Sequence, residues 1–191
     1  MIDEFLTDCS RRMDQAVEHL RRELTSIRTG RASPLLIEDL SIDYYGQPTP
    51  LKQIAGISAP EARLLLIQPW DKGALPDIEK AIVASDLGIT PSNDGNVIHL
   101  PIPQLSEDRR RDIVRLVKQR TEDARVAVRN IRRDVHDDLR ELVTEKEASE
   151  DEFRRSEGAL QQATDKHVEA IDTVGQQKEA EVMQVLASKT L

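Results

Sequence analysis

Hydrophobic residues recur at helical spacing in three long stretches of the chain. In the first stretch, every seventh position from Leu6 to Ile27 is hydrophobic, which predicts an amphipathic helix that ends at Gly30. The second stretch begins at Ser106, a residue suited to cap a helix N-terminus, and runs to about residue 147. The third begins with SEDE at residues 149–152, a capping box. The pattern therefore predicts three long helices.

Each of the two later helices has one narrow hydrophobic seam. The seam of the second consists of Ile113, Val117, Ala124, Val128, Ile131, Val135, Leu139 and Leu142, and that of the third of Phe153, Leu160, His167, Ile171, Val174, Val182, Val185 and Leu186. Helices of about 40 residues are about 60 Å long, so such seams predict an extended three-helix bundle. The first and last helices must then be neighbours in space.

The periodicity changes between residues 31 and 104. The runs LLIEDLSIDYYG, PLKQIAGIS and ARLLLIQPW are typical of strands broken by Pro and Gly, and IEKAIVASDLG predicts a short helix. A turn and a strand follow in SNDGNVIHLPIP. We therefore expect an α+β protein with a bundle of residues 1–30 and 105–191 and a small β/α head of residues 31–104. Tyr44, Tyr45 and Trp70 are expected to fill the core of this head.

Two short connectors join the predicted bundle and head, and both contain proline. They are TGRASP at Thr29–Pro34 and PIPQ at Pro101–Gln104. Lying side by side, they would form a double hinge, for which the candidate residues are Gly30, Ala32, Ser33, Pro103 and Gln104. The alternative is a pair of rigid elbows that fix one angle.

Charge is distributed unevenly along this chain of 191 residues, whose formal net charge is −8. From Asp134 onward there are 15 acidic and 7 basic residues, whereas residues 1–133 contain 20 of each. Residues 106–135 alone contain 10 Lys and Arg against 6 Asp and Glu, and VRNIRRD at Val128–Asp134 has three arginines. An acidic protein with a local basic face is therefore expected.

The basic residues of the second helix lie on one side of it. At 100° per residue they form a strip roughly 120° from the hydrophobic seam. This basic strip consists of Arg111, Lys118, Arg125, Arg129, Arg132 and Arg133. One interpretation is a solvated face of i,i+4 ion pairs, but only Glu122 and Asp108 can reach it along the same helix. The other is a footprint for a nucleic-acid backbone, which guanidinium groups bind through paired hydrogen bonds. Because the strip lacks aromatics, such a contact would recognise backbone and shape rather than base sequence.

Motifs of catalysis, cofactor binding and metal binding are missing from the sequence. The histidines at 19, 99, 136 and 167 are scattered, and GxxxxGK, GxGxxG and GxSxG do not occur. Cys9 is the only cysteine and falls on the seam, where a core role is expected. The N-terminus lacks signal-peptide features, and no apolar run approaches the roughly 18 residues of a membrane span. We therefore expect a cytoplasmic binding protein with a movable head, without cofactor or metal and without enzymatic activity.

Several motifs together resemble one family, the bacterial ribosome-recycling factors. They are IRTGRASP, YYGQPTPLKQIA, IEKAI-ASDLG, P-NDG, LSEDRR and VAVRNIRRD, in this order and spacing. The resemblance extends from the first helix to the KEAEVMQ segment. It implies an L-shaped monomer, with a three-helix bundle and a β/α head on a flexible double connector. The sequence departs from the family pattern at Val135-His136, after RNIRRD, and at His99.

The resemblance also implies a function in protein biosynthesis after translation termination. Such a factor binds the post-termination ribosome, with its bundle on the 23S ribosomal RNA of the large subunit. Elongation factor G and GTP hydrolysis then drive it to split the ribosome into subunits, and the head would meet the elongation factor. Arg132 foremost, with Arg129 and Arg133, would contact the RNA, as would Arg28 and Arg31 at the first connector. From the strip we add Arg125 to this set.

Three alternative functions follow if the resemblance is set aside. A helical adaptor or cochaperone would need an exposed apolar stripe on a further helix face, which the sequence does not show. An enzyme that hydrolyses peptidyl-tRNA would be associated with a Gly-Gly-Gln tripeptide, which does not occur. A ribosome-bound inactivity or storage factor is compatible with the basic strip alone.

Overall fold

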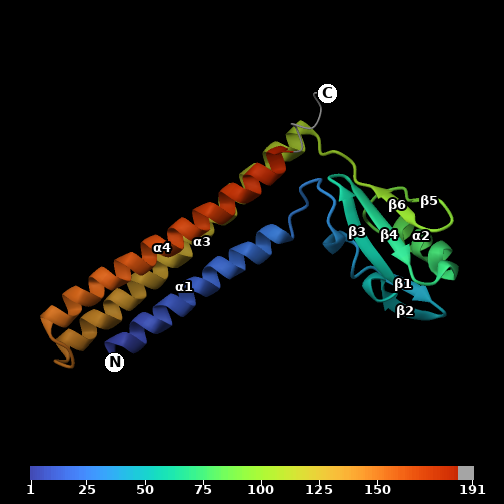
Figure 1. Ribbon diagram of the computed structural model, residues 1–191. Helices are drawn as coiled ribbons and strands as arrows, with labels where there is room; N and C mark the ends of the chain where they lie inside the picture. Colours follow the sequence, from blue (N-terminus) through green and yellow to red (C-terminus); the bar gives the residue numbers. More distant parts are fainter. Residues whose placement is uncertain (185–191) are drawn as a thin grey trace. The chain divides into compact units, whose positions relative to one another are not determined.

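The computed structural model describes residues 1–184, which form two compact units (Figure 1). The first unit contains Met1–Arg28 and Glu107–Gln184, and the second contains Thr29–Ser106. The sequence predicts a head of residues 31–104, which is two residues shorter at each end. Val185 and Leu186, predicted for the third seam, lie outside the described residues.

The first unit is a bundle of three long helices, which are α1 at Ile2–Thr25, α3 at Glu107–Thr144 and α4 at Glu150–Gln184 (Figure 1). Each helix packs against the other two, so the first and last helices are neighbours, as the hydrophobic pattern predicts. Together with the β-sheet and short helix inserted between α1 and α3, this confirms the predicted α+β fold class.

Two of the predicted helix ends are set by local backbone chemistry. At the start of α4, the Ser149 hydroxyl accepts from the Glu152 backbone N–H at 3.2 Å, and the Glu152 carboxylate accepts from the Ser149 backbone N–H at 2.8 Å. This is the predicted capping box. Helix α3 ends at Thr144, three residues earlier than predicted, because Lys146 adopts a left-handed conformation with φ 61°. The Glu147 backbone N–H then donates back to the Leu142 carbonyl at 2.9 Å.

The core of the bundle contains small and polar residues among the aliphatic ones. On α4, Ser156, Thr164 and His167 are buried, and the two hydroxyls donate to helix carbonyls four or fewer residues earlier. Gly175 also faces the core, whereas the predicted seam residue Val174 is only half-buried. The seam on α4 is therefore less apolar than predicted, and the helices approach one another closely where these side chains are short.

The second unit, the head, contains six strands and one α-helix. The strands are β1 at Ser41–Tyr44, β2 at Gln47–Pro50, β3 at Ala55–Glu61, β4 at Leu64–Pro69, β5 at Ser92–Asn93 and β6 at Ile98–Pro101. Strands β1 and β2 form a hairpin, and the others form an antiparallel sheet in the order β3-β4-β6-β5. Helix α2 at Leu75–Ala84 buries Ile78 and Ile82 in the same core as the sheet.

The head core is almost purely aliphatic, and two of the three aromatics predicted to fill it lie elsewhere. Tyr44 packs against the core, as predicted. Tyr45 is 79% exposed and Trp70 is 70% exposed, so their prediction as core residues is wrong. Tyr45 lies at the tip of the β1–β2 hairpin with φ 50°, and Trp70 follows the last residue of β4. Both residues lie at the ends of strands, where their side chains remain exposed.

Both connectors are hydrogen-bonded to the head at the β3–β4 turn. The Ala32 backbone N–H donates to the Ala62 carbonyl at 2.7 Å, and the Ile102 N–H donates to the Arg63 carbonyl at 2.8 Å. Ala32 and Ile102 are also buried in the head core. Gly30 has φ 76°, and a Cβ atom there would lie 3.0 Å from Leu105 Cγ. The two connectors therefore touch each other at Gly30 and Leu105.

Candidate nucleic-acid interface

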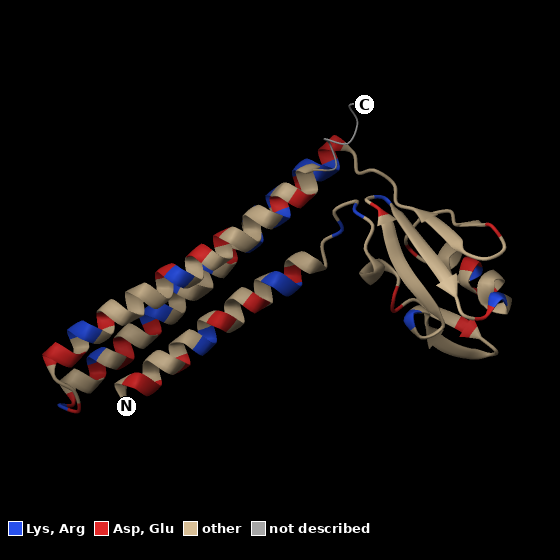
Figure 2. Ribbon diagram, viewed as in Figure 1, with Lys and Arg blue, Asp and Glu red and all other residues tan. Residues whose placement is uncertain are grey.

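The basic strip occupies a surface of α3 that borders α4. Acidic and basic residues are interspersed along the long helices (Figure 2). How far the positive charge of each strip residue is compensated therefore depends on the residues around it. Arg125 and Arg132 reach across to α4, where they contact Asp172 and Gln161. Because Asp172 is charged and Gln161 is neutral, the positive charge of the strip is compensated at Arg125 but not at Arg132.

Arg125 is enclosed by two carboxylates. Its Nε and Nη2 atoms each lie 2.6 Å from Asp172 Oδ1, and Nη1 lies 2.7 Å from Glu122 Oε2. Hydrogen bonds to Glu122 and Asp172 raise the pKa of the Arg125 guanidinium, and its bond to Glu122 lowers the pKa of that carboxyl. Arg125 is therefore internally compensated and links α3 to α4.

Arg111, Lys118 and Arg129 differ in their partners. Arg111 lies 2.5 Å from Glu107 Oε1, and the exposed Lys118 forms no ion pair within residues 1–184. Arg129 is mostly exposed and shares Glu122, at 3.3 Å from its Nη1 atom. Because Arg125 already binds Glu122, the carboxylate neutralises Arg129 only in part.

Arg132 and Arg133 contact neutral amides instead of carboxylates. Arg132 Nε donates to Gln161 Oε1 at 2.9 Å, and Arg133 Nη2 donates to Asn130 Oδ1 at 2.9 Å. The adjacent Asp134 lies on the other side of α3, where its Oδ2 is 3.2 Å from Arg12 Nη2. Among the arginines of the strip, positive charge is therefore least compensated at Arg129, Arg132 and Arg133, which we call the arginine cluster.

The arginine cluster can bind a polyanion through several charge-assisted hydrogen bonds. Guanidinium groups present paired N–H donors that match phosphate oxygens. The spacing of basic residues predicts Arg125 and Arg132 on one strip but not their partners Asp172 and Gln161, because rules of i,i+3 and i,i+4 spacing describe contacts within one helix only. The α4 partners divide the predicted set, since Arg125 is neutralised and Arg132 is not.

The structure places the other predicted RNA-binding arginines at the connectors. Arg28 is exposed and lines a 340 Å³ pocket of the bundle with Arg109 and Asp112 near the start of α3. Arg109 and Arg129 are separated along α3 by about 30 Å, at about 1.5 Å per residue. Arg28 is thus not part of the arginine cluster. Arg31 is exposed and belongs to the head unit.

The predicted hinge residues all belong to the head unit. Ala32 is anchored by its hydrogen bond to Ala62, and Ser33 follows it immediately. Pro103 and Gln104 follow the anchored Ile102, and Gln104 Oε1 lies 3.5 Å from Arg63 Nη1. Gly30 precedes the anchor on the first connector. Along the chain, Gly30, Pro103 and Gln104 thus lie outside the anchored pair Ala32 and Ile102, whereas Ser33 lies inside it.

His99 does not extend the basic surface onto the head. Its Nε2 atom lies 3.2 Å from Asp94 Oδ2. The backbone N–H groups of Val97 and Asn96, followed by the contact with His99, lower the pKa of Asp94 to about 2. The ionised Asp94 and His99 form a local pair.

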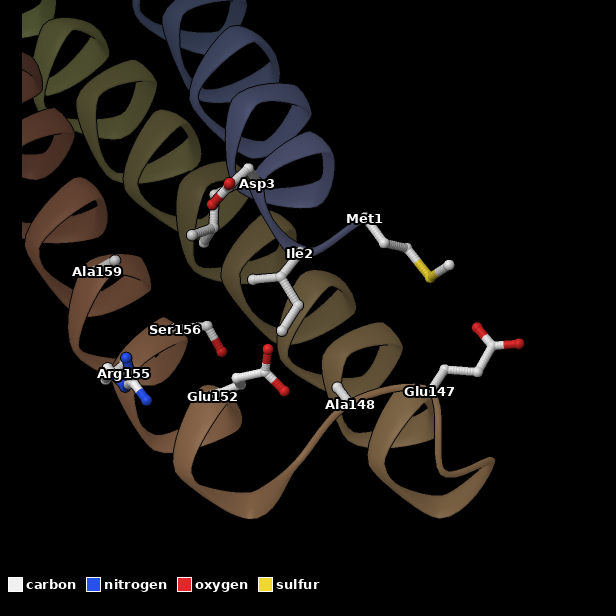
Figure 3. Close-up of a pocket in the computed structure, with 10 residues that line it drawn as sticks. Met1, Ile2, Asp3, Glu147, Ala148, Glu152, Arg155, Ser156 and Ala159 are labelled. Atoms are coloured by element: carbon white, nitrogen blue, oxygen red, sulfur yellow. The ribbon is translucent and has the colours of Figure 1, made fainter.

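Two adjoining pockets of about 500 and 480 Å³ lie at the α3–α4 turn of the bundle, and Figure 3 shows the second of them. The second is lined by residues such as Ile2, Ala148, Glu152 and Arg155. Glu152 serves as the partner of Ser149 in the capping box, so its carboxylate has a structural role. Within residues 1–184, no cluster of three or more His, Cys, Asp or Glu side chains is arranged to bind a metal ion. In the same residues, no helix has the length and apolarity needed to cross a membrane.

Comparisons with known proteins agree over nearly the whole chain. The family model "Ribosome recycling factor" matches residues 20–183. The ribosome-recycling factors of Syntrophomonas wolfei and of a Geobacillus species are each 54% identical over 185 residues, which is 97% of this chain and 100% of each relative. A solution structure of the ribosome recycling factor matches with a TM-score of 0.73 at 41% identity and covers 96% of this chain and 97% of its own.

A second solved structure that matches this chain is of a ribosomal complex. It contains models for the Thermus thermophilus ribosome recycling factor and the Escherichia coli elongation factor G bound to the E. coli post-termination complex. The matching chain is 44% identical with a TM-score of 0.63, and the match covers 95% of this chain and 98% of that one.

Fold and surface together define an α+β protein with a helical bundle, an inserted β/α head and a guanidinium cluster suited to a polyanion. The chain belongs to the ribosome recycling factor family. Membership confirms the resemblance that the sequence motifs indicate. It also makes the protein a translation factor of ribosome recycling, not an enzyme.

Proposed function

We propose that this protein binds the post-termination ribosome and, with elongation factor G and GTP hydrolysis, splits it into subunits in the cytoplasm. In this proposal the protein acts as a monomer, and its bundle lies on the 23S RNA of the large subunit. Arg132 foremost, with Arg129 and Arg133, contacts the RNA backbone. Arg28 and Arg31 add contacts at the connector, and Arg125 contributes mainly by fixing α3 to α4.

The observation that supports this proposal is the arginine cluster, in which Arg132 and Arg133 have neutral partners. Arg132 and Arg133 are bound by amide oxygens, so neither loses an ion pair when a phosphate approaches. A carboxylate partner would have to be displaced first, as at Arg125. The aromatic side chains Tyr45 and Trp70 belong to the head, so the cluster itself can bind backbone phosphates without stacking on bases.

The test is binding to purified large ribosomal subunits over a series of salt concentrations. We expect Arg132→Ala to weaken binding roughly tenfold or more, the size of one charge-assisted hydrogen bond. Arg129→Ala/Arg133→Ala should weaken it further and should lower the slope of log K against log salt by about one per lost phosphate contact. The slope falls because fewer counterions are released.

The matched control is Arg11→Ala/Arg21→Ala, which removes two exposed arginines of α1 that pair with Asp8 and Glu18 on their own helix. It changes the net charge by the same amount as the double substitution in the cluster. If the control and the cluster variants behave alike, net charge alone governs binding and the assigned RNA contact is wrong.

We place the contact with elongation factor G on the head. Tyr45 and Trp70 supply exposed aromatic surface there, and the Tyr45 hydroxyl donates to Asp71 Oδ2 at 2.9 Å, which brings the two aromatics to one end of the head. Exposed aromatics are enriched in protein interfaces. We expect Tyr45→Ala/Trp70→Ala to reduce splitting by elongation factor G while binding to isolated large subunits is unchanged. Loss of both activities together would contradict this assignment.

We further propose that the connectors form a double hinge during splitting. The test is a cross-link between cysteines introduced at Ser33 and Pro103, which would tie the second connector to the head. Cys9 is buried, so the introduced cysteines are the accessible ones. We expect the cross-linked protein to bind ribosomes but to split them slowly, with recovery when a reducible linker is cleaved. Unchanged splitting would show that the connectors act as rigid elbows.

A further inference from the structure

Arg132 is bound at one end of its guanidinium by a residue of the neighbouring helix. Its Nε donates to Gln161 Oε1 at 2.9 Å. A guanidinium has five N–H donors in a planar fork, and phosphate can approach either along the edge that includes Nε or at the end formed by Nη1 and Nη2. Because Gln161 occupies Nε, the end with Nη1 and Nη2 is the one left for an incoming phosphate.

Gln161 is itself oriented by a third residue. Its Nε2 donates to Asp165 Oδ1 at 2.8 Å, one turn further along α4. The two ends of an amide differ, since the nitrogen donates and the oxygen accepts. With the nitrogen directed to Asp165, the oxygen must face Arg132. The Asp165 carboxylate therefore accepts a hydrogen bond from Gln161, and among the described residues it forms no ion pair with Arg132.

The same α3–α4 face contains a counterexample at Arg125, seven residues before Arg132. There α4 presents Asp172, eleven residues after Gln161 and on the same side of the helix, and its carboxylate binds Nε and Nη2 of Arg125. Arg125 is thus both positioned and neutralised, whereas Arg132 is positioned by a neutral acceptor. At both sites Nε of the arginine donates to a residue of α4, but Arg125 is also bound through Nη2 and by Glu122, and the α4 residues differ in charge.

From this difference we propose that Gln161, oriented by Asp165, is a positioning residue that fixes Arg132 through Nε while its full positive charge stays available to an RNA phosphate. The inference rests on the proposed contact of Arg132 with RNA. Gln161 restricts the long, flexible arginine side chain before binding, so less conformational entropy is lost when the phosphate is bound. A neutral amide does this without an ion pair that the phosphate would have to displace.

The test compares Gln161→Leu and Gln161→Glu with the native chain in the salt-dependent binding assay with purified large subunits. Gln161→Leu removes the hydrogen bond but no charge, so we expect affinity to fall about threefold to tenfold with an unchanged salt slope. Gln161→Glu provides a carboxylate for Arg132, so we expect affinity to fall roughly tenfold and the slope to decrease by about one. Thermal unfolding of each variant checks that the bundle remains folded.

Gln162→Glu is the matched control, because Gln162 is exposed and is the next residue of α4. The substitution adds the same charge as Gln161→Glu, but on another side of the helix. Both Gln161 variants are also made together with Arg132→Ala, where we expect them to have no further effect. That loss of effect distinguishes positioning of Arg132 from a general structural role.

Four results would contradict the RNA contact of Arg132, the positioning role of Gln161 or the importance of its neutral charge. If Arg132→Ala binds normally, the proposed RNA contact fails, and the inference fails with it. If Arg132→Ala is weak but Gln161→Leu binds like the native chain, only the positioning role is wrong. An equal loss from Gln161→Leu on the Arg132→Ala background would also exclude positioning. If Gln161→Glu and Gln162→Glu behave alike, the neutral character of the partner has no importance.

Discussion

The bundle and the head bury different kinds of side chain. In the head, the residues that lie deepest are aliphatic, among them Ile42, Leu65, Ile67, Ile78 and Leu100. In the bundle, aliphatic residues alternate with Thr121, Ser156, Thr164, His167 and Gly175, all of which face the core. The head therefore depends on apolar volume, and the bundle depends on close helix approach and on hydrogen bonds that satisfy its buried polar groups.

This difference suits the two functions that we propose for the units. A narrow seam leaves most of the surface of each long helix for charged and polar residues, which allows α3 to carry the arginine cluster and α4 to supply the partner of Arg132. The head has a larger apolar core for its length, so its two exposed aromatics are not needed for stability. Substitutions should accordingly destabilise the two units by different mechanisms.

The largest effect is expected from a cavity in the head. Ile67 is fully buried in the central strand β4, where it pairs with Ile57 of β3 and Ile98 of β6. We expect Ile67→Ala to lower the free energy of unfolding of the head by about 2–5 kcal/mol. Urea unfolding followed by the fluorescence of Trp70, the only tryptophan, measures the head.

Circular dichroism at the helical band serves as the control, because most helical residues belong to the bundle. If the two units unfold independently, only the fluorescence transition moves to lower urea. An equal shift of both transitions would show that the units unfold as one cooperative system.

A smaller loss is expected from added volume in the bundle. A Cβ atom at Gly175 would lie 2.6 Å from Thr121 Oγ1 and 3.0 Å from Thr121 Cγ2. The Thr121 hydroxyl donates to the Val117 carbonyl at 2.7 Å, so the side chain cannot move without losing this bond. We expect Gly175→Ala to cost about 1–3 kcal/mol despite the higher helix propensity of alanine.

Thr121→Ala removes both obstructing atoms, so the double variant should recover most of the loss. Circular dichroism during thermal unfolding measures each variant. If the two single effects simply add, the contact between Gly175 and Thr121 does not limit the approach of α3 and α4.

The comparison also shows where sequence patterns suffice. The seven-residue repeat predicted the long helices and the proximity of α1 and α4, and the Ser149–Glu152 box predicted the start of α4. Such signals are local, because they depend on residues within one or two turns. The position of Trp70 and Tyr45 could not be predicted this way, since hydrophobicity alone does not say whether the end of a strand is covered by a helix.

Of the candidate site, the sequence predicts the residues of α3 but not their partners on α4. The spacing of the arginines placed Arg125 and Arg132 on one strip of α3, and the structure agrees with that placement. Their different charge compensation depends on Asp172 and Gln161, whose alignment with α3 follows from how α4 packs. Packing of this kind is a tertiary property, and the spacing within α3 contains no information about it.

A loss of about 1 kcal/mol is expected at the buried histidine of the bundle. His167 Nε2 lies 2.7 Å from Asp14 Oδ1, and Nδ1 lies 2.5 Å from the Ala163 carbonyl. Asp14→Ala leaves the buried ring nitrogen without its acceptor, which costs roughly the net value of one hydrogen bond. His167→Leu should cost less, because the exposed Asp14 is then rehydrated. Urea unfolding followed by circular dichroism measures both variants. A larger loss from His167→Leu would show that the shape of the imidazole matters more than its hydrogen bonds.

The smallest effect is a gain, at the turn between α3 and α4. Lys146 has φ 61°, a left-handed conformation. This conformation is strained for a residue with a Cβ atom but not for glycine. Lys146 occupies the position after the α3 C-terminus at which glycine is usual. We expect Lys146→Gly to raise the free energy of unfolding of the bundle by about 0.5–1 kcal/mol, less the entropy that glycine adds to the unfolded chain. Lys146→Ala is the control, since it removes the same charge but retains Cβ. A gain from both variants would mean that the charge of Lys146, and not its backbone conformation, destabilises the turn.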